Sequence, residues 1–179
     1  TWTEEENAMQ DRIAPNALRF ERLLDAPIEK VWRYLTEPDL RAQWFMAGPS
    51  DTRVGGTLGL TMNHHRLSDQ DVPTPERYRA YSGHSWKERI TRFEPPFLLA
   101  FTWEDGEAGE VTFELSQQGA QTLLVLTHTG LRGSADAINF GGGWHSHLAA
   151  LKSCIKGEGV PNFWALHEKA EALMEEALR

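Results

Sequence analysis

The sequence predicts a single domain of the α+β class, in which an antiparallel sheet packs against a long helix. Segments 97–103, 111–116 and 122–129 are rich in strand-forming residues and follow one another through short turns, as in an antiparallel meander. A helical pattern at 144–156 comes after them, with apolar residues at spacings of three and four. A chain of 179 residues can build one substantial core but is short for two domains.

The N-terminal part contributes a leader, one strand and two short helices. Residues 1–16 are polar and acidic, and we expect them to pack loosely or to form a short helix. The segment 18–24 alternates like a strand with one partly buried face, and it ends before Pro27. Asp25 is a candidate cap for the helix expected at 27–35, because its carboxylate can accept hydrogen bonds from free backbone amides. A second short helix follows and ends in large aromatic residues.

The remaining elements are two more strands, a loop and a final helix. Strands are predicted at 57–63 and 86–93, and the proline-containing stretch 65–79 between them is expected to be a hairpin loop. Three consecutive glycines, 141–143, are expected to form a flexible lead into the long helix. A further amphipathic helix at 161–178 would pack through Phe163, Leu166, Ala170, Leu173 and Ala177.

Composition argues against several classes of partner. The formal charge is −8 and acidic residues occur along the whole chain, so nucleic acid or an anionic membrane surface would be repelled. No window approaches the roughly 18 consecutive apolar residues of a spanning helix, and the N-terminal stretch lacks the pattern of a signal peptide. We therefore expect no nucleic-acid partner, no membrane insertion and a cytoplasmic location. The single cysteine, Cys154, fits a reducing compartment.

Several short motifs occur in one order and at compatible spacing. They are FERLLDAPIEKVWRYLTEPDLRAQWF, VGGTLGL, ITRFEPPFLLAFTW, TLLVLTHTGL and GGWHSHLAALKS. Together they resemble the START-like (SRPBCC) superfamily, most closely its branch homologous to the C-terminal domain of the heat-shock-protein-90 ATPase activator. The resemblance covers about residues 18–156.

This resemblance implies a helix-grip fold. In that fold a curved antiparallel sheet of about six or seven strands wraps around the long C-terminal helix, often with a hydrophobic pocket between them. The domain would then span 17–157, with 1–16 as a polar leader and 158–179 as an appended helix. The segments 65–85 and 131–142 are longer than the family pattern needs, and they lie where the mouth of a pocket would be.

The candidate ligand-binding residues are those whose side chains would face the space between the sheet and the long helix. Each of the large apolar ones is explained more simply by core filling, whereas the set is suggestive because the chain has seven tryptophans. The candidates are Trp32, Trp44, Phe45, Met62, Trp86, Glu88, Phe101, Trp103, Phe113, Leu126, His128, Trp144, His147, Leu148 and Leu151.

No group of residues has the sequence pattern of a catalytic site, so no catalytic residue is predicted. Glu88 is the best candidate for acid–base chemistry, with Arg92 as a partner, although a surface ion pair is the simpler explanation. Cys154 is expected to be a buried, inert thiol. The histidine spacings do not match a metal site, and neither a metal nor another cofactor is predicted. His128 or His147 could instead hydrogen-bond a polar group of a ligand.

Three functions are open at this point. A binding protein for a hydrophobic or amphipathic small molecule would need an enclosed cavity of roughly 300 Å³ or more. An enzyme acting on a polyketide-like or aromatic substrate, which the wider superfamily implies, would need a polar pair in that cavity, such as His128 or His147 with Glu88. A chaperone-ATPase-regulating interaction domain, which the family name suggests, would bind the cognate heat-shock ATPase. The terminal helix could also pack on a second copy, which would give a homodimer.

Overall fold

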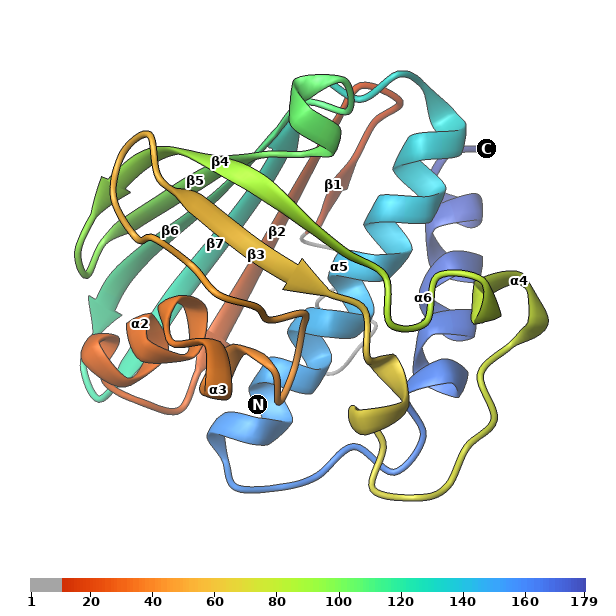
Figure 1. Ribbon diagram of the computed structural model, residues 1–179, viewed down its shortest axis with the longest axis horizontal. Helices are drawn as coiled ribbons and strands as arrows, with labels where there is room; N and C mark the ends of the chain where they lie inside the picture. Colours follow the sequence, from red (N-terminus) through yellow and green to blue (C-terminus); the bar gives the residue numbers. More distant parts are fainter. Residues whose placement is uncertain (1–10) are drawn as a thin grey trace.

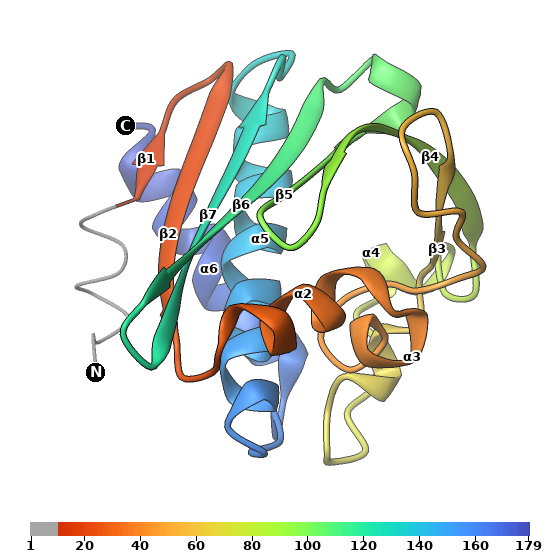
Figure 2. The same ribbon diagram turned by 90° about the vertical axis from the view of Figure 1, so that its left-hand side faces the viewer.

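A computed structural model describes residues 11–179 and contains a seven-stranded antiparallel sheet with the strand order β1-β2-β7-β6-β5-β4-β3. The sheet curves around one long helix, α5, as Figure 2 shows most clearly. This arrangement is the predicted helix-grip fold. The strands are β1 (Arg12–Ile13), β2 (Ala17–Leu24), β3 (Thr57–Thr61), β4 (Ser85–Glu94), β5 (Leu98–Thr102), β6 (Glu110–Gln118) and β7 (Gln121–Thr129).

In strand β2 the alternating sequence pattern predicted the buried side correctly. The strand pairs with β7 over its whole length, and every second residue is buried. Arg22 belongs to the buried set, and its guanidinium Nη1 donates to Asp11 Oδ1 at 2.7 Å. The expectation of a loose or helical leader is wrong for residues 11–13, because Asp11 pairs with Arg22 and β1 extends the sheet. The rest of that expectation, for residues 1–10, falls outside the described part of the chain.

Two short helices, α2 (Ile28–Thr36) and α3 (Pro38–Arg41), lie at one end of the sheet (Figure 2). The predicted cap is wrong, since Gln117 Oε1 rather than Asp25 accepts from the Ile28 amide at 2.9 Å. The Arg41 guanidinium is buried and donates to the carbonyls of Met46 (2.9 Å) and Gly59 (3.2 Å). Burial lowers the pKa of Arg41 to about 10. Arg41 thereby fixes the turn that carries the aromatic residues after α3.

The long helix α5 (Ser134–Ile155) begins ten residues earlier than the sequence indicated. The glycines 141–143 are therefore inside the helix, and the predicted flexible lead is wrong. A Cβ on Gly141 would lie 2.8 Å from Met174 Sδ, and one on Gly142 would lie 2.8 Å from Glu171 Cγ. Two of the three glycines thus allow the last helix to approach α5 closely, which offsets their poor helix propensity.

The last helix, α6 (Phe163–Ala177), runs beside α5 (Figures 1 and 2) and is the predicted appended helix. The predicted packing side is partly wrong, because Leu166 and Leu173 are only half-buried and Ala177 is exposed. The buried residues of α6 are Phe163, Trp164, His167, Ala170 and Met174. Trp164 and His167 are buried although they carry polar atoms. The spacing of the aliphatic residues alone therefore predicts the wrong buried side.

The stretch 65–79 is not a plain hairpin loop. It starts within a short 3-10 helix, η1 (His64–Arg66), and ends with a single helical turn, α4 (Glu76–Arg79). In Figure 1 the segment extends from β3 to the side of α6 before it returns to β4. Tyr78 of α4 stacks on Trp164 of α6, with ring centroids 4.9 Å apart. The insertion is therefore anchored to the appended helix.

Candidate functional site

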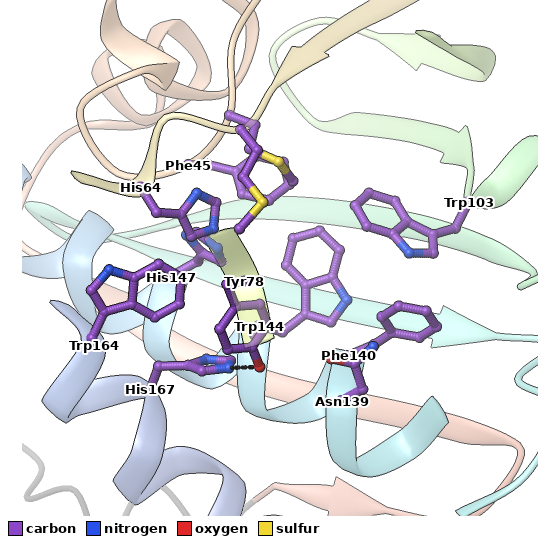
Figure 3. Close-up of a pocket in the computed structure, with 13 residues that line it drawn as sticks. Phe45, His64, Tyr78, Trp103, Asn139, Phe140, Trp144, His147, Trp164 and His167 are labelled. Atoms are coloured by element: carbon purple, nitrogen blue, oxygen red, sulfur yellow. Dashed lines mark hydrogen bonds between the residues drawn. The ribbon is translucent and has the colours of Figure 1, made fainter. Parts of the chain in front are cut away.

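A small cavity lies between the sheet, α5 and the inserted segment, as Figure 3 shows. Its volume is about 120 Å³. The lining is mostly aromatic and comes from the turn after α3, the ends of β3 and β5, the η1–α4 insertion, α5 and α6. The lining residues are Phe45, Met46, Met62, His64, Tyr78, Trp103, Asn139, Phe140, Gly143, Trp144, His147, Trp164 and His167.

An open outer cleft of about 410 Å³ adjoins this inner cavity. The two spaces share five lining residues, among them Tyr78, Trp103 and Phe140, so only a layer of side chains separates them. The inner cavity is smaller than the roughly 300 Å³ expected for an enclosed ligand pocket, whereas the outer cleft exceeds that size. The outer cleft is lined by Met62, Tyr78, Tyr81, His84, Trp86, Trp103, Glu104, Asn139 and Phe140.

The structure brings six of the predicted residues to these two spaces. They are Phe45, Met62, Trp86, Trp103, Trp144 and His147. Seven others lie in the fully buried or half-buried core and line neither space. These seven are Trp32, Trp44, Phe101, Phe113, Leu126, Leu148 and Leu151. Trp32 is the furthest from the prediction, since it packs against Phe93 with ring centroids 5.5 Å apart.

Glu88 is buried, and it is not the partner of Arg92. Its carboxylate accepts from Trp86 Nε1 (2.9 Å), from Thr102 Oγ1 (2.9 Å), and from the backbone amides of Glu104 and Asp105 (both 3.0 Å). Arg92 pairs with Glu94 instead, on the exposed side of β4. Four donors use the acceptor positions of Glu88, so its role is to hold the surrounding backbone and Trp86 in place.

His128 lies behind Trp144 and does not reach the cavity. Its Nε2 carries the proton that is donated to the Ala108 carbonyl (2.7 Å), and its Nδ1 accepts from Trp144 Nε1 (3.0 Å). Burial lowers the pKa of His128, which agrees with this neutral form. His128 therefore lines neither space, and its hydrogen bond orients the Trp144 indole.

Two neutral histidines do line the inner cavity. His147 donates from Nδ1 to the Trp44 carbonyl at 2.8 Å, which leaves Nε2 as the acceptor nitrogen of this ring. His64 packs edge-on against His147, and its Nδ1 has no hydrogen-bond partner among the described residues. Burial lowers the pKa of His64 to about 3 and holds the pKa of His147 well below its usual value. Both rings can therefore hydrogen-bond a polar group of a ligand without carrying charge.

A hydrogen-bonded network closes one side of the cavity, and sequence reasoning missed it. The Tyr78 hydroxyl lies 2.9 Å from His167 Nε2 and donates to Glu171 Oε1 at 2.8 Å (Figure 3). Arg77 forms an ion pair with Glu171. On the far side, His167 Nδ1 lies 3.1 Å from Ser146 Oγ, which donates to the Gly142 carbonyl. The network links α4, α5 and α6.

Several of these contacts come from two segments outside the sheet and the long helix. Tyr78 lies in the insertion, whereas Trp164 and His167 lie on the appended helix. One signal could have found the buried side of α6: Trp164 and His167 share a helical side with Phe163, and an aromatic cluster on a terminal helix indicates a packing surface. No sequence signal would have placed Tyr78, because its position depends on how the insertion folds back.

Cysteine chemistry and metal binding find little support in the described residues. Cys154 is half-buried rather than buried, donates to the Gln43 carbonyl at 3.3 Å, and has its pKa raised by burial. Within residues 11–179, no three histidine, cysteine or acidic side chains are grouped so that they could hold a metal ion. None of the helices in that range is long and apolar enough to cross a membrane.

Comparison with known proteins gives a consistent picture. The family model described as "Activator of Hsp90 ATPase homolog 1-like protein" matches residues 25–156. The solution structure of the protein encoded by gene BPP1335 from Bordetella parapertussis is 41% identical, with a TM-score of 0.79, and the match covers 93% of this chain and 88% of that one. No curated protein matches the chain.

Two more distant structures share the fold. The crystal structure of CalU16 from Micromonospora echinospora is 22% identical, with a TM-score of 0.69 and coverage of 94% of this chain and 96% of that one. The Aha1 dimer from Colwellia psychrerythraea is 18% identical, with a TM-score of 0.58 and coverage of 78% and 95%. At these identities the likeness extends to the architecture alone.

Proposed function

We propose that this chain, which belongs to the family of activator of Hsp90 ATPase homolog 1-like proteins, binds an elongated, mainly apolar small molecule. One end of the ligand would enter the inner cavity and the rest would lie in the outer cleft. The observation that carries the proposal is the pair of adjoining aromatic-lined spaces on the concave side of the sheet. Concave, largely apolar sites with a few convergent polar groups are typical of ligand-binding proteins.

The size of the inner cavity limits what can enter it. A volume of about 120 Å³ is somewhat smaller than the ~150 Å³ cavity that takes up benzene in an engineered protein. A branched alkyl group or a single ring is therefore the largest group that fits without movement of the lining. Met46 and Met62 line the cavity, and their unbranched side chains can adjust to such a group at small cost.

The polar atoms at the inner end favour a ligand with one hydrogen-bonding group there. His147 offers Nε2 as an acceptor, and His64 Nδ1 is buried without a partner among the described residues. A hydroxyl or amide group on the ligand could hydrogen-bond either nitrogen. Such a bond would stabilise the complex, because a buried polar atom without a partner costs about 1–3 kcal/mol.

The enzyme hypothesis receives less support from the same residues. It needs His128 or His147 to act together with Glu88, but the hydrogen bonds of His128 and Glu88 are taken up by other groups. Only His147 reaches the inner cavity. A binding function needs no such pair, so we favour binding over catalysis.

A titration with N-phenyl-1-naphthylamine, a neutral fluorescent probe, tests the proposal. We expect saturable, one-to-one binding with enhanced probe fluorescence. Gly143 lines the inner cavity, and a Cβ there would have no atom within 4 Å, so Gly143→Leu should fold and fill the space. This variant should bind the probe at least about tenfold more weakly.

The matched control is Ala172→Leu, which adds the same side chain at an exposed position of α6. It should bind the probe as the wild type does. Equal binding by Gly143→Leu and the wild type, or no saturable binding by the wild type, would contradict the proposal.

A further inference from the structure

We infer that the outer cleft is a subsite for a cationic amine, such as an alkylated ammonium group, at the outer end of the ligand. This inference rests on the proposed function, because the inner cavity would hold the apolar end of the same molecule. Three observations support it: the arrangement of aromatic rings, the local charge and the way in which both are held in place.

The aromatic walls of the outer cleft meet at steep angles. The rings of Trp86 and Trp103 are 6.2 Å apart with an interplanar angle of 81°, and those of Trp103 and Phe140 are 6.0 Å apart at 77°. Figure 3 shows Trp103 and Phe140 on the same side of the site. Rings that meet in this way offer the corner of an aromatic box, the arrangement that recognises ammonium groups through the negative ring faces.

The charge beside the aromatic walls of the outer cleft is negative. Glu104 lines the cleft, and none of the described residues that line it is a lysine or an arginine. Arg132 pairs with Glu104 (2.7 Å), but it also pairs with Asp136 (2.8 Å), so one guanidinium serves two carboxylates. The trio carries a net negative charge at neutral pH, and the chain as a whole carries −8. A cation is therefore attracted both locally and over longer distance.

Glu88 holds the aromatic wall and the carboxylate in one arrangement. Glu104 and Asp105 have positive φ angles of 50° and 57°, a region that non-glycine residues rarely adopt. The Glu88 carboxylate accepts from both of their backbone amides and also from Trp86 Nε1. Because strained turns of this kind persist only when their surroundings stabilise them, we regard Glu88 as a positioning residue of the subsite.

The alternative ligands fit this cleft less well. An anionic group would meet the Glu104 carboxylate and the negative faces of the rings. A neutral group would gain apolar contacts but nothing from the charge. The cleft should therefore discriminate between ligands of equal shape by charge alone.

A matched pair of probes tests this directly. Phenethyltrimethylammonium and (3,3-dimethylbutyl)benzene have the same shape, with a carbon in place of the charged nitrogen in the second. Measured by isothermal titration calorimetry at low ionic strength, the cation should bind about tenfold more tightly. This preference should fall as salt is added, because the attraction to Glu104 is partly exposed to solvent.

Substitutions test whether the preference for the cation arises in the outer cleft. Glu104→Gln and Trp86→Leu should each reduce the ratio of the two affinities by severalfold. Glu107→Gln, in the same turn but outside the lining, should leave it unchanged. Glu88→Gln should also lower the ratio, because it loosens Trp86 and the turn that carries Glu104. A general loss of structure would instead weaken both probes equally and leave the ratio unchanged.

The outcomes separate the two proposals. If neither probe binds, the proposed function itself is contradicted. If both bind equally, or if the preference is unaffected by Glu104→Gln, the binding function stands and the cationic subsite is overturned.

Discussion

At the scale of single residues, the inner end of the site depends on histidines that burial keeps neutral. His64 is only 8% exposed, and burial lowers its pKa to about 3, against about 6.5 in the unfolded chain. Below pH 6.5 the unfolded state binds a proton that the folded state does not, so stability falls as the pH falls. Between pH 7 and pH 5, His64 alone should cost about 2 kcal/mol of unfolding free energy.

Urea denaturation at pH 7 and pH 5 measures this loss. His64→Phe should reduce the difference between the two pH values by about 2 kcal/mol. His65→Phe is the matched control, because His65 is the exposed neighbour in the same short helix, and it should leave the difference unchanged. If both variants keep the wild-type pH dependence, the assignment of His64 as a buried neutral residue is wrong.

At the scale of elements, the glycines of α5 have different roles, although they are adjacent. A Cβ at Gly142 would lie 3.3 Å from the Glu171 backbone, whereas one at Gly143 would meet nothing within 4 Å. Gly143→Ala should therefore stabilise the protein by up to about 1 kcal/mol through helix propensity. Gly142→Ala should destabilise it by about 1–3 kcal/mol, because α6 has to shift.

Urea denaturation of the two alanine variants measures the difference, and each variant is the control for the other. Equal effects of the two substitutions would contradict the close packing of α5 and α6. The close packing of α6 on Gly141 and Gly142 also explains why the start of α5 was predicted wrongly. In a sequence, three consecutive glycines indicate a loop, and the helix that packs against them is not visible there.

None of the residues of α4 is buried, so this turn depends on the contacts of Tyr78 and Arg77 with α6. Tyr78→Phe keeps the stacking on Trp164 but removes the hydrogen bonds to His167 and Glu171. We expect the loss of about 1 kcal/mol to raise local opening of the insertion about fivefold. Limited trypsin cleavage after Arg79 would report it as a faster rate.

Tyr81→Phe is the matched control, because Tyr81 is 56% exposed and belongs to the same segment. Its cleavage rate should equal that of the wild type. An unchanged rate for Tyr78→Phe would mean that the hydrogen bonds of Tyr78 do not hold the insertion.

At the scale of the whole molecule, the parts of the fold with a regular pattern could be predicted from the sequence. The alternation in β2 and β7 and the short links of the meander were enough to place the sheet, and the motifs around them were enough to place the family. The ends of the strands agree within a few residues, because turn-forming residues mark them.

The site could be predicted only in part. Trp144 and His147 lie on α5 and Trp103 directly follows β5, so their places depend on regular elements of the fold, and the resemblance made them candidates. Tyr78 and Trp164 could not be placed, since their positions result from contacts between an insertion and an appended helix. The hydrogen bonds of Glu88 could not be predicted, because two of its four donors are backbone amides, which a sequence pattern does not reveal.

The central claim, that a small molecule binds in the inner cavity, is tested most directly by NMR of the methionine methyl groups. Met46 and Met62 line the cavity, whereas Met174 packs between α6 and α5 near Gly141. On titration with N-phenyl-1-naphthylamine, the methyl signals of Met46 and Met62 should shift together and saturate, while that of Met174 stays in place. Shifts of Met174 alone, or of no described methionine, would contradict the account.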